Sequence, residues 1–257
     1  METRSPLKEK PLHLPGQSLQ DEIDRLHDDF MPMAITVFFF GLFSAYEWVA
    51  WLLQWKHSPL PVTVVTAICA AYVAGKYVEI RPQLRNLKLG REGERVVGQS
   101  LEALREKGYK VLHDIEVPGK FNVDHVIIGP GGVFVIETKT ASKPMKGDVR
   151  VVYDGESVTV NGFTPDRNPV FQAKALADWV GHLLTKETRK TLPVRGVVLY
   201  PGWYVEKQPK GCDVWVLNET VFPSFLEQPR SPLSADEIQM ATDVLVRYVR
   251  ASAAKVS

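Results

Sequence analysis

The sequence has few cysteines and almost no net charge. Its 257 residues include only two cysteines, Cys69 and Cys212, which argues against a disulfide framework and excludes a cysteine-rich zinc module. Thirty-one basic and thirty acidic side chains leave a formal net charge of +1. A protein that binds nucleic acid by phosphate attraction alone carries a strong basic excess, so any nucleic-acid site here has to be local.

The apolar residues are unevenly distributed along the chain. Residues 31–55 carry a single charged side chain, Glu47, and a second apolar run covers residues 60–80. Each run is long enough for a helix across a hydrocarbon core of roughly 30 Å, which takes about 20 residues. We therefore predict two transmembrane helices, at about 31–55 and 60–80.

Basic residues flank the outer ends of both runs, whereas the linker between them holds only Lys56. The positive-inside rule then predicts a multi-pass membrane protein with both termini in the cytoplasm. Tryptophans at 48, 51 and 55 make Glu47 an interfacial carboxylate. The alternative is a pair of buried helices in a soluble protein, although core helices are usually shorter and more amphipathic. The predicted organisation is a flexible cytoplasmic tail over 1–30 that ends in a short amphipathic helix, the two spanning helices within 31–80, and a globular domain over 90–257.

The distal domain alternates between helical and strand-like spacing of its apolar residues. Helices are expected over 90–108, over 168–184 and from Ser234 onward, and strands over 110–117, 121–128, 133–140, 149–153, 157–160, 194–200 and 213–217. This order predicts a mixed α/β sheet covered by helices. Glu94 and Gln172 lie on the apolar stripes of the first two helices, so both polar side chains are expected to face inward.

The most informative stretch, residues 121–140, reads FNVDHVIIGPGGVFVIETKT. Its GPGG sequence suits a tight turn between two strands. If Ile128 pairs with Val133 across that turn, Asp124 falls opposite Glu137. Lys139, two residues further on, points to the same face.

Opposed carboxylates of this kind are destabilising unless a cation lies between them, because their Cβ atoms are about 4.5–5.5 Å apart. Oxygen ligands at this spacing suit Mg²⁺, with Mn²⁺ as an alternative. Such an ion lowers the pKa of bound water and stabilises charge on a phosphodiester. Lys139 would orient the attacking water or neutralise the developing phosphorane.

This run resembles the PD-(D/E)XK nuclease superfamily, whose core is an acidic residue, a turn, and E-x-K on the next strand. More narrowly, it is similar to the NERD, or nuclease-related, domain. The matching motifs are G-x-x-G-E at Gly90, Gly93 and Glu94, an aspartate in an apolar strand at Asp124, G-h-h-V-I-E-x-K from Gly132 to Lys139, and N-P-x-x-Q at Asn168, Pro169 and Gln172. The resemblance covers about residues 90–184.

The resemblance implies a restriction-endonuclease-like fold and a Mg²⁺-dependent phosphodiesterase or endonuclease acting on DNA. It implies Asp124 and Glu137 as metal ligands with the Thr138 carbonyl as a candidate third, Lys139 as a catalytic residue, and Glu94 and Gln172 as the residues that complete the site. One alternative is a nuclease for RNA or modified DNA. Another is a membrane-tethered nucleic-acid-binding or signalling module without turnover, which the near-neutral charge favours.

Other polar and aromatic residues carry weaker signals. His125 should point away from Asp124 and is interpreted as structural, and the remaining histidines lack ligand spacing. A phosphate-contacting rim and scattered surface charges are equally good interpretations of Lys143, Lys146, Arg150 and Lys174. Trp203 and Trp215 are expected in the core or on a sheet face rather than as base-stacking platforms.

Overall fold

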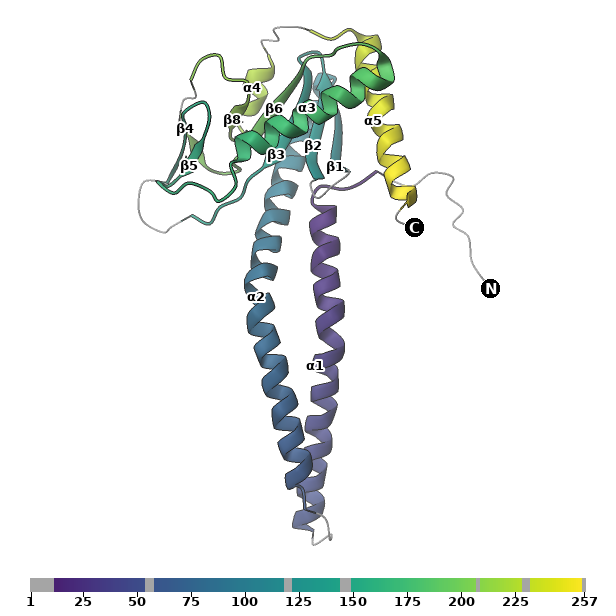
Figure 1. Ribbon diagram of the computed structural model, residues 1–257, viewed down its shortest axis with the longest axis vertical. Coiled ribbons are helices and arrows are strands. Elements are labelled where there is room, and N and C mark those ends of the chain that lie inside the picture. Colours follow the sequence, from purple (N-terminus) through teal and green to yellow (C-terminus); the bar gives the residue numbers. More distant parts are fainter. Residues whose placement is uncertain are drawn as a thin grey trace, which may run out of the picture. The chain divides into compact units, whose positions relative to one another are not determined.

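The computed structural model describes residues 12–53, 58–117, 122–143, 149–206, 209–227 and 232–255. The chain divides into two compact units. One, residues 18–88, is helical, and the other consists of Met1–Gln17 with Leu89–Ser257 and contains both sheets (Figure 1). The second unit is called the distal domain below.

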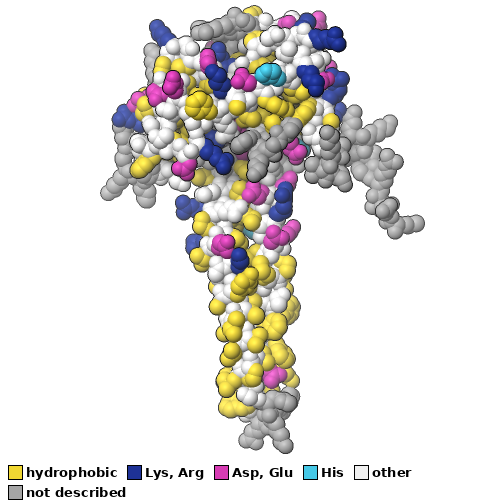
Figure 2. Space-filling view, in the orientation of Figure 1, with side chains coloured by type: hydrophobic (Ala, Val, Ile, Leu, Met, Phe, Trp, Pro, Cys, Tyr) yellow, Lys and Arg dark blue, Asp and Glu magenta, His cyan; other side chains and the backbone are white. Residues whose placement is uncertain are grey.

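Two long helices, α1 (Gln17–Leu52) and α2 (Leu60–Glu102), supply the helical unit. Both are long and apolar enough to cross a membrane, by length and composition. Figure 2 shows apolar side chains over much of their surface. Both polar and aromatic contacts join the helices: Ser44 Oγ lies 3.0 Å from Thr63 Oγ1, Trp48 Nε1 donates to the same oxygen at 2.9 Å, and the Phe30 and Tyr77 ring centroids are 5.8 Å apart.

Both helices extend beyond their predicted limits. α1 begins at Gln17, so the short helix expected at the end of the tail is present and is continuous with the first predicted span. α2 does not stop near residue 80 but continues to Glu102, and it absorbs the helix that we expected to begin separately at Gly90. The intervening residues 81–89 are rich in Arg, Leu and Lys, which are strong helix formers, and the helix continues through Pro82. A glycine costs only about 1 kcal/mol inside a helix.

The larger sheet has five strands in the order β1-β2-β3-β6-β8. The first three run antiparallel, and β3, β6 and β8 run parallel, which confirms the prediction of a mixed sheet. The strands are β1 (Lys110–Glu116), β2 (Asn122–Gly129), β3 (Gly132–Thr138), β6 (Val194–Leu199) and β8 (Trp215–Leu217). Phe121, where we expected β2 to begin, lies outside the described residues.

A smaller sheet has three strands in the order β5-β4-β7. β4 and β5 correspond to the strands predicted over 149–153 and 157–160, whereas the two-residue strand β7 was missed. The bounds are β4 (Arg150–Tyr153), β5 (Val158–Val160) and β7 (Tyr204–Val205).

Helices cover both faces of the larger sheet and bury its alternating side chains. Val126 and Val135 pack with α3 (Pro169–Thr188) and α5 (Ala235–Lys255). Ile127 and Ile136 pack on the other face with the end of α2, the 3₁₀ helix η1 (Ala103–Lys107) and α4 (Phe222–Leu226), the last of which was not predicted. The sheet is therefore buried on both sides, and a polar side chain inside it needs a specific reason.

Candidate active site

The β2–β3 hairpin has the register predicted from its turn. Ile128 pairs with Val133, and the paired positions continue to His125 and Ile136. At the next position, Asp124 uses its side chain instead of its backbone: Asp124 Oδ2 accepts the Thr138 backbone N–H at 2.7 Å. Asp124 is thus held near the start of β2, beside the Glu-x-Lys segment at the end of β3.

Lys139 connects two of the other predicted site residues. Its Nζ lies 2.6 Å from Glu137 Oε1 and 3.0 Å from Gln172 Oε1. Its backbone N–H donates to Leu199 O at 2.9 Å, which holds the residue beside β6. Gln172 is in the first turn of α3, whose start is fixed by the Asn168 side chain accepting from the Val170 N–H at 2.9 Å. The N-P-x-x-Q segment therefore positions the side-chain amide of Gln172 to accept a hydrogen bond from the ammonium of Lys139.

Glu94 comes to the site from α2 and is buried, with 8% of its surface exposed. Burial, with the charges of Asp114 and Glu137 acting in the same direction, raises its pKa to about 8. A backbone hydrogen bond from Gly16 opposes this shift. Gly16 has a φ of +69°, and a Cβ there would approach Arg91 Cγ to 3.1 Å, so the chain before α1 packs closely against this turn of α2.

The carboxylates of the site repel one another. Burial raises the pKa of Asp124, and the charges of Glu137 and Glu94 add to the effect. Burial also raises the pKa of Glu137, against the lowering effect of Lys139. Glu137 Oε2 is buried and accepts no hydrogen bond. A buried anionic oxygen without a partner is costly, and a bound cation would remove that cost.

The acidic side chains of the site could hold a hard divalent cation only if water, substrate or backbone oxygens completed its coordination. Within the described residues, no three His, Cys, Asp or Glu side chains gather into a metal-binding group. Mg²⁺ is usually held by one or two carboxylates, with water and substrate phosphate as further ligands, so a carboxylate pair such as Asp124 and Glu137 is compatible with it. The Thr138 carbonyl remains the candidate third ligand from the chain.

Sequence reasoning missed Asp114, the residue whose charge acts most strongly on Glu94. Asp114 lies within β1, is 2% exposed, and has a left-handed φ of 49°. Asn122 Nδ2 donates to its Oδ1 at 3.1 Å. The one available signal was an aspartate within the apolar run of that strand, and alternation alone does not indicate its backbone conformation.

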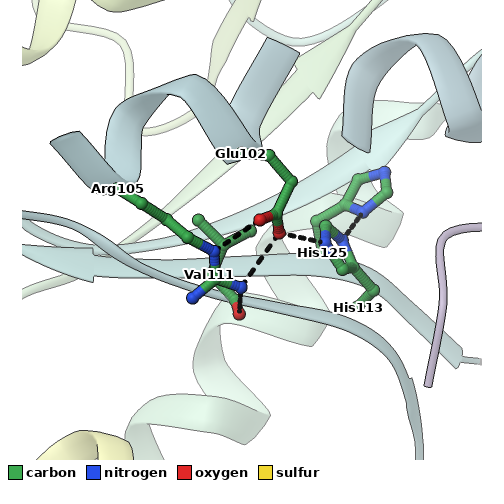
Figure 3. A network of polar contacts seen from close by, with 5 residues as sticks. All are labelled: Glu102, Arg105, Val111, His113 and His125. Atoms are coloured by element: carbon green, nitrogen blue, oxygen red, sulfur yellow. Dashed lines mark hydrogen bonds and ion pairs between the residues drawn. The ribbon is translucent and has the colours of Figure 1, made fainter. Parts of the chain in front are cut away.

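The two buried histidines form a network beside the site (Figure 3). The Nδ1 atoms of His113 and His125 are 2.8 Å apart, and His113 Nε2 lies 2.8 Å from Glu102 Oε1. Arg105 pairs with Glu102 and donates to Val111 O at 2.8 Å. A neutral histidine has one N–H. If the Nε2–H of His113 donates to Glu102, its Nδ1 accepts from the Nδ1–H of His125, so each of the two hydrogen bonds contains one proton. The network ties β1 and β2 to the end of α2, in keeping with a structural role for His125.

Two of the four basic residues considered as a phosphate-contacting rim are paired with acidic neighbours. Arg150 pairs with Glu206 at 2.6 Å and Lys174 with Asp213 at 2.8 Å. Lys143 donates to Gly202 O and lies over the Trp203 ring, 5.5 Å from its centroid. Lys146 lies outside the described residues. Trp203 is 3% exposed and Trp215 stacks on Phe134, as expected for core and sheet-face aromatics.

Comparison with known proteins adds three findings. Residues 89–201 match the family model described as "Nuclease-related domain". An uncharacterised protein of Bacillus anthracis is 41% identical over 54 residues, which is 20% of this chain and 26% of that relative. This chain thus aligns with about a quarter of the relative's length. The structure of Pyrococcus furiosus SfsA in complex with Ca²⁺ is 16% identical, covers 59% of this chain and 54% of its own, and superposes with a TM-score of 0.26.

Proposed function

We propose that the chain is a metal-dependent nuclease of the PD-(D/E)XK type that hydrolyses phosphodiester bonds in DNA, because residues 89–201 match the nuclease-related domain model. We also propose that the distal domain has a restriction-endonuclease-like fold. In this proposal α1 and α2 anchor the protein in a membrane as two spanning helices, with both termini and the distal domain in the cytoplasm.

The observation that carries the proposal is the buried, unpartnered Glu137 Oε2 among carboxylates whose pKa values are raised. Asp124 and Glu137 would hold Mg²⁺ or Mn²⁺, and the Thr138 carbonyl would be a third ligand. When bound, such an ion lowers the pKa of water and stabilises negative charge on a phosphodiester.

The chain's own polar groups have distinct roles in this proposal. Lys139 is the catalytic residue, because its ammonium is the cationic group beside Glu137 and is 31% exposed, so it can reach a phosphate or the attacking water. Gln172 is a positioning residue that fixes Lys139 Nζ. Glu94, whose pKa is about 8, holds a proton over much of the neutral range and so limits the charge of the cluster.

A membrane-tethered binding or signalling module without turnover is the second candidate. The favouring observation is the ion pair between Lys139 and Glu137, which already neutralises one oxygen of the presumed metal ligand at 2.6 Å. A module would keep this pair permanently, whereas a nuclease would share Glu137 between the lysine and a metal ion.

A cleavage assay separates the two candidates. Full-length protein in detergent is incubated with labelled DNA, and in parallel with RNA, in Mg²⁺ or in EDTA. We expect Mg²⁺-dependent cleavage of DNA that falls by at least about 10²-fold in Lys139→Ala, since a positioned electrostatic group typically supplies that much rate. Lys186→Ala, at an exposed lysine on α3, is the matched control and should retain full activity. No metal-dependent cleavage of either polymer would favour the module.

A further inference from the structure

A cavity of about 550 Å³ adjoins the proposed active site. Lys139 lines it, together with residues that follow β3 and residues of the turn after β5. Tyr200 and Trp203 also line it and are themselves almost fully buried, so they form a fixed wall rather than a mobile one. The volume lies within the roughly 300–1,000 Å³ usual for small-molecule pockets, which accommodates a nucleobase with its sugar.

Phe163 lines this cavity and is 77% exposed. Its position is fixed by the backbone: Phe163 and Val160 exchange two hydrogen bonds, of 2.8 and 3.0 Å, across a two-residue turn. The turn residues Asn161 and Gly162 have φ values of 52° and 80°. A large aromatic ring that is left in solvent on a turn with a fixed backbone is available for stacking, because binding does not have to order the backbone that carries it.

The charge of the cavity lining is of one sign. Lys139 and Lys143 line it, and no aspartate or glutamate is among the described lining residues. The nearby basic residues Arg150 and Lys174 are paired with acidic side chains and do not line it. The hydroxyl and amide groups of Ser142, Thr164 and Asn161 provide polar contacts. Aromatic, cationic and polar groups together match a nucleotide with its phosphate.

We propose that this cavity receives one unpaired nucleobase next to the phosphodiester that is cleaved, with Phe163 as the stacking residue and Lys143 contacting the backbone phosphate. The inference rests on the proposed nuclease function, because it names the form of that site's substrate. A base inside a duplex has both faces covered by its neighbours and has to leave the stack to enter a pocket. The favoured substrate is therefore a single-stranded or locally unpaired segment of nucleic acid.

Binding measurements on full-length protein in detergent test this proposal without any need for turnover. The probes are fluorescein-labelled single-stranded DNA, single-stranded RNA and duplex DNA of one sequence, all in EDTA. Phe163→Ala should weaken single-strand binding by about 5-fold or more, the effect of losing one base–aromatic stack, and change duplex binding by less than about 2-fold. Phe163→Trp should retain the affinity. The DNA and RNA arms show which polymer supplies the base.

The matched control is Phe171→Ala, since Phe171 is 68% exposed on α3 and does not line the cavity. It should leave all three affinities unchanged. The proposal is overturned if Phe163→Ala binds single strands like the parent, if duplex binding falls equally, or if the parent binds none of the probes. Metal-dependent cleavage without a Phe163 effect would reject the pocket and keep the nuclease. Binding that depends on Phe163 without cleavage would do the reverse.

Discussion

The helical unit and the distal domain place apolar side chains in opposite ways. In the helices Ile68 and Phe38 are 65% and 63% exposed, and buried Ser44 bonds to Thr63. In the sheet Val126 and Ile127 are completely buried. In the distal domain folding removes apolar surface from water, whereas in the helical unit much of it stays on the outside. If α1 and α2 span a membrane as proposed, the lipid provides the non-aqueous environment that the core provides in the distal domain.

The largest effect is expected when a charged residue replaces an exposed apolar residue of the helical unit. Ile68→Lys should sharply reduce the fraction of full-length protein that resists alkaline carbonate extraction, because a lysine at the centre of a span costs about 2.5–3.5 kcal/mol. Phe171→Lys changes a side chain of similar exposure, 68%, in the distal domain and should leave membrane retention unchanged. Quantitative release of the parent by carbonate would contradict two spanning helices.

The next effect concerns the polar residues that interrupt the buried sheet. Asp124→Asn keeps an oxygen to accept the Thr138 N–H, so the fold should survive, but it removes a negative charge from the proposed metal site. Cleavage at low Mg²⁺ should fall on the order of 10²-fold and recover partly at raised Mg²⁺. Titrating Mg²⁺ against rate measures this. Lys139→Ala should show no such recovery, and an Asp124→Asn enzyme that matches the parent at every Mg²⁺ concentration would remove Asp124 from the metal site.

The smallest effect is a change in the pH dependence of stability. The Glu94 pKa is raised from 4.5 to about 8, so folding favours the protonated form, and its contribution is present below pH 4.5 and is lost as the pH rises to about 8. In EDTA, the Tm of the parent should decline through that window. Glu94→Gln, which cannot ionise and can still accept from Gly16, should decline less steeply than Glu92→Gln at an exposed position of α2. Identical slopes would show that Glu94 titrates normally.

The hairpin at the centre of the site could be predicted because local signals agree there. The GPGG turn fixed the pairing of Ile128 with Val133, and a side-chain period of two then determined that Asp124, Glu137 and Lys139 share a face. The amide of Gln172 was predictable from the Asn-Pro helix start. These features depend on residues close in the sequence or on one well-defined turn.

The features that were missed depend on distant contacts or on unusual backbone. Asp114 acts on Glu94 from a left-handed conformation that strand periodicity does not indicate. The continuity of α2 was missed because Gly90 and Gly93 suggested a helix start, although the helix formers around them outweigh two glycines. Nothing in the first seventeen residues indicated that Gly16 would meet Glu94.

The contact between Gly16 and Glu94 also has a consequence for truncation and proteolysis of the chain. Pro15 lies where a side chain on Gly98 would be, so a short segment before α1 is packed into the same domain as residues after Leu89. The domain is discontinuous in sequence, with the helical hairpin as an insertion between its two pieces. A fragment that starts at Gly90 lacks the donor to Glu94, and a protease cut within the hairpin divides the domain into two fragments that have to remain associated for the site to stay complete.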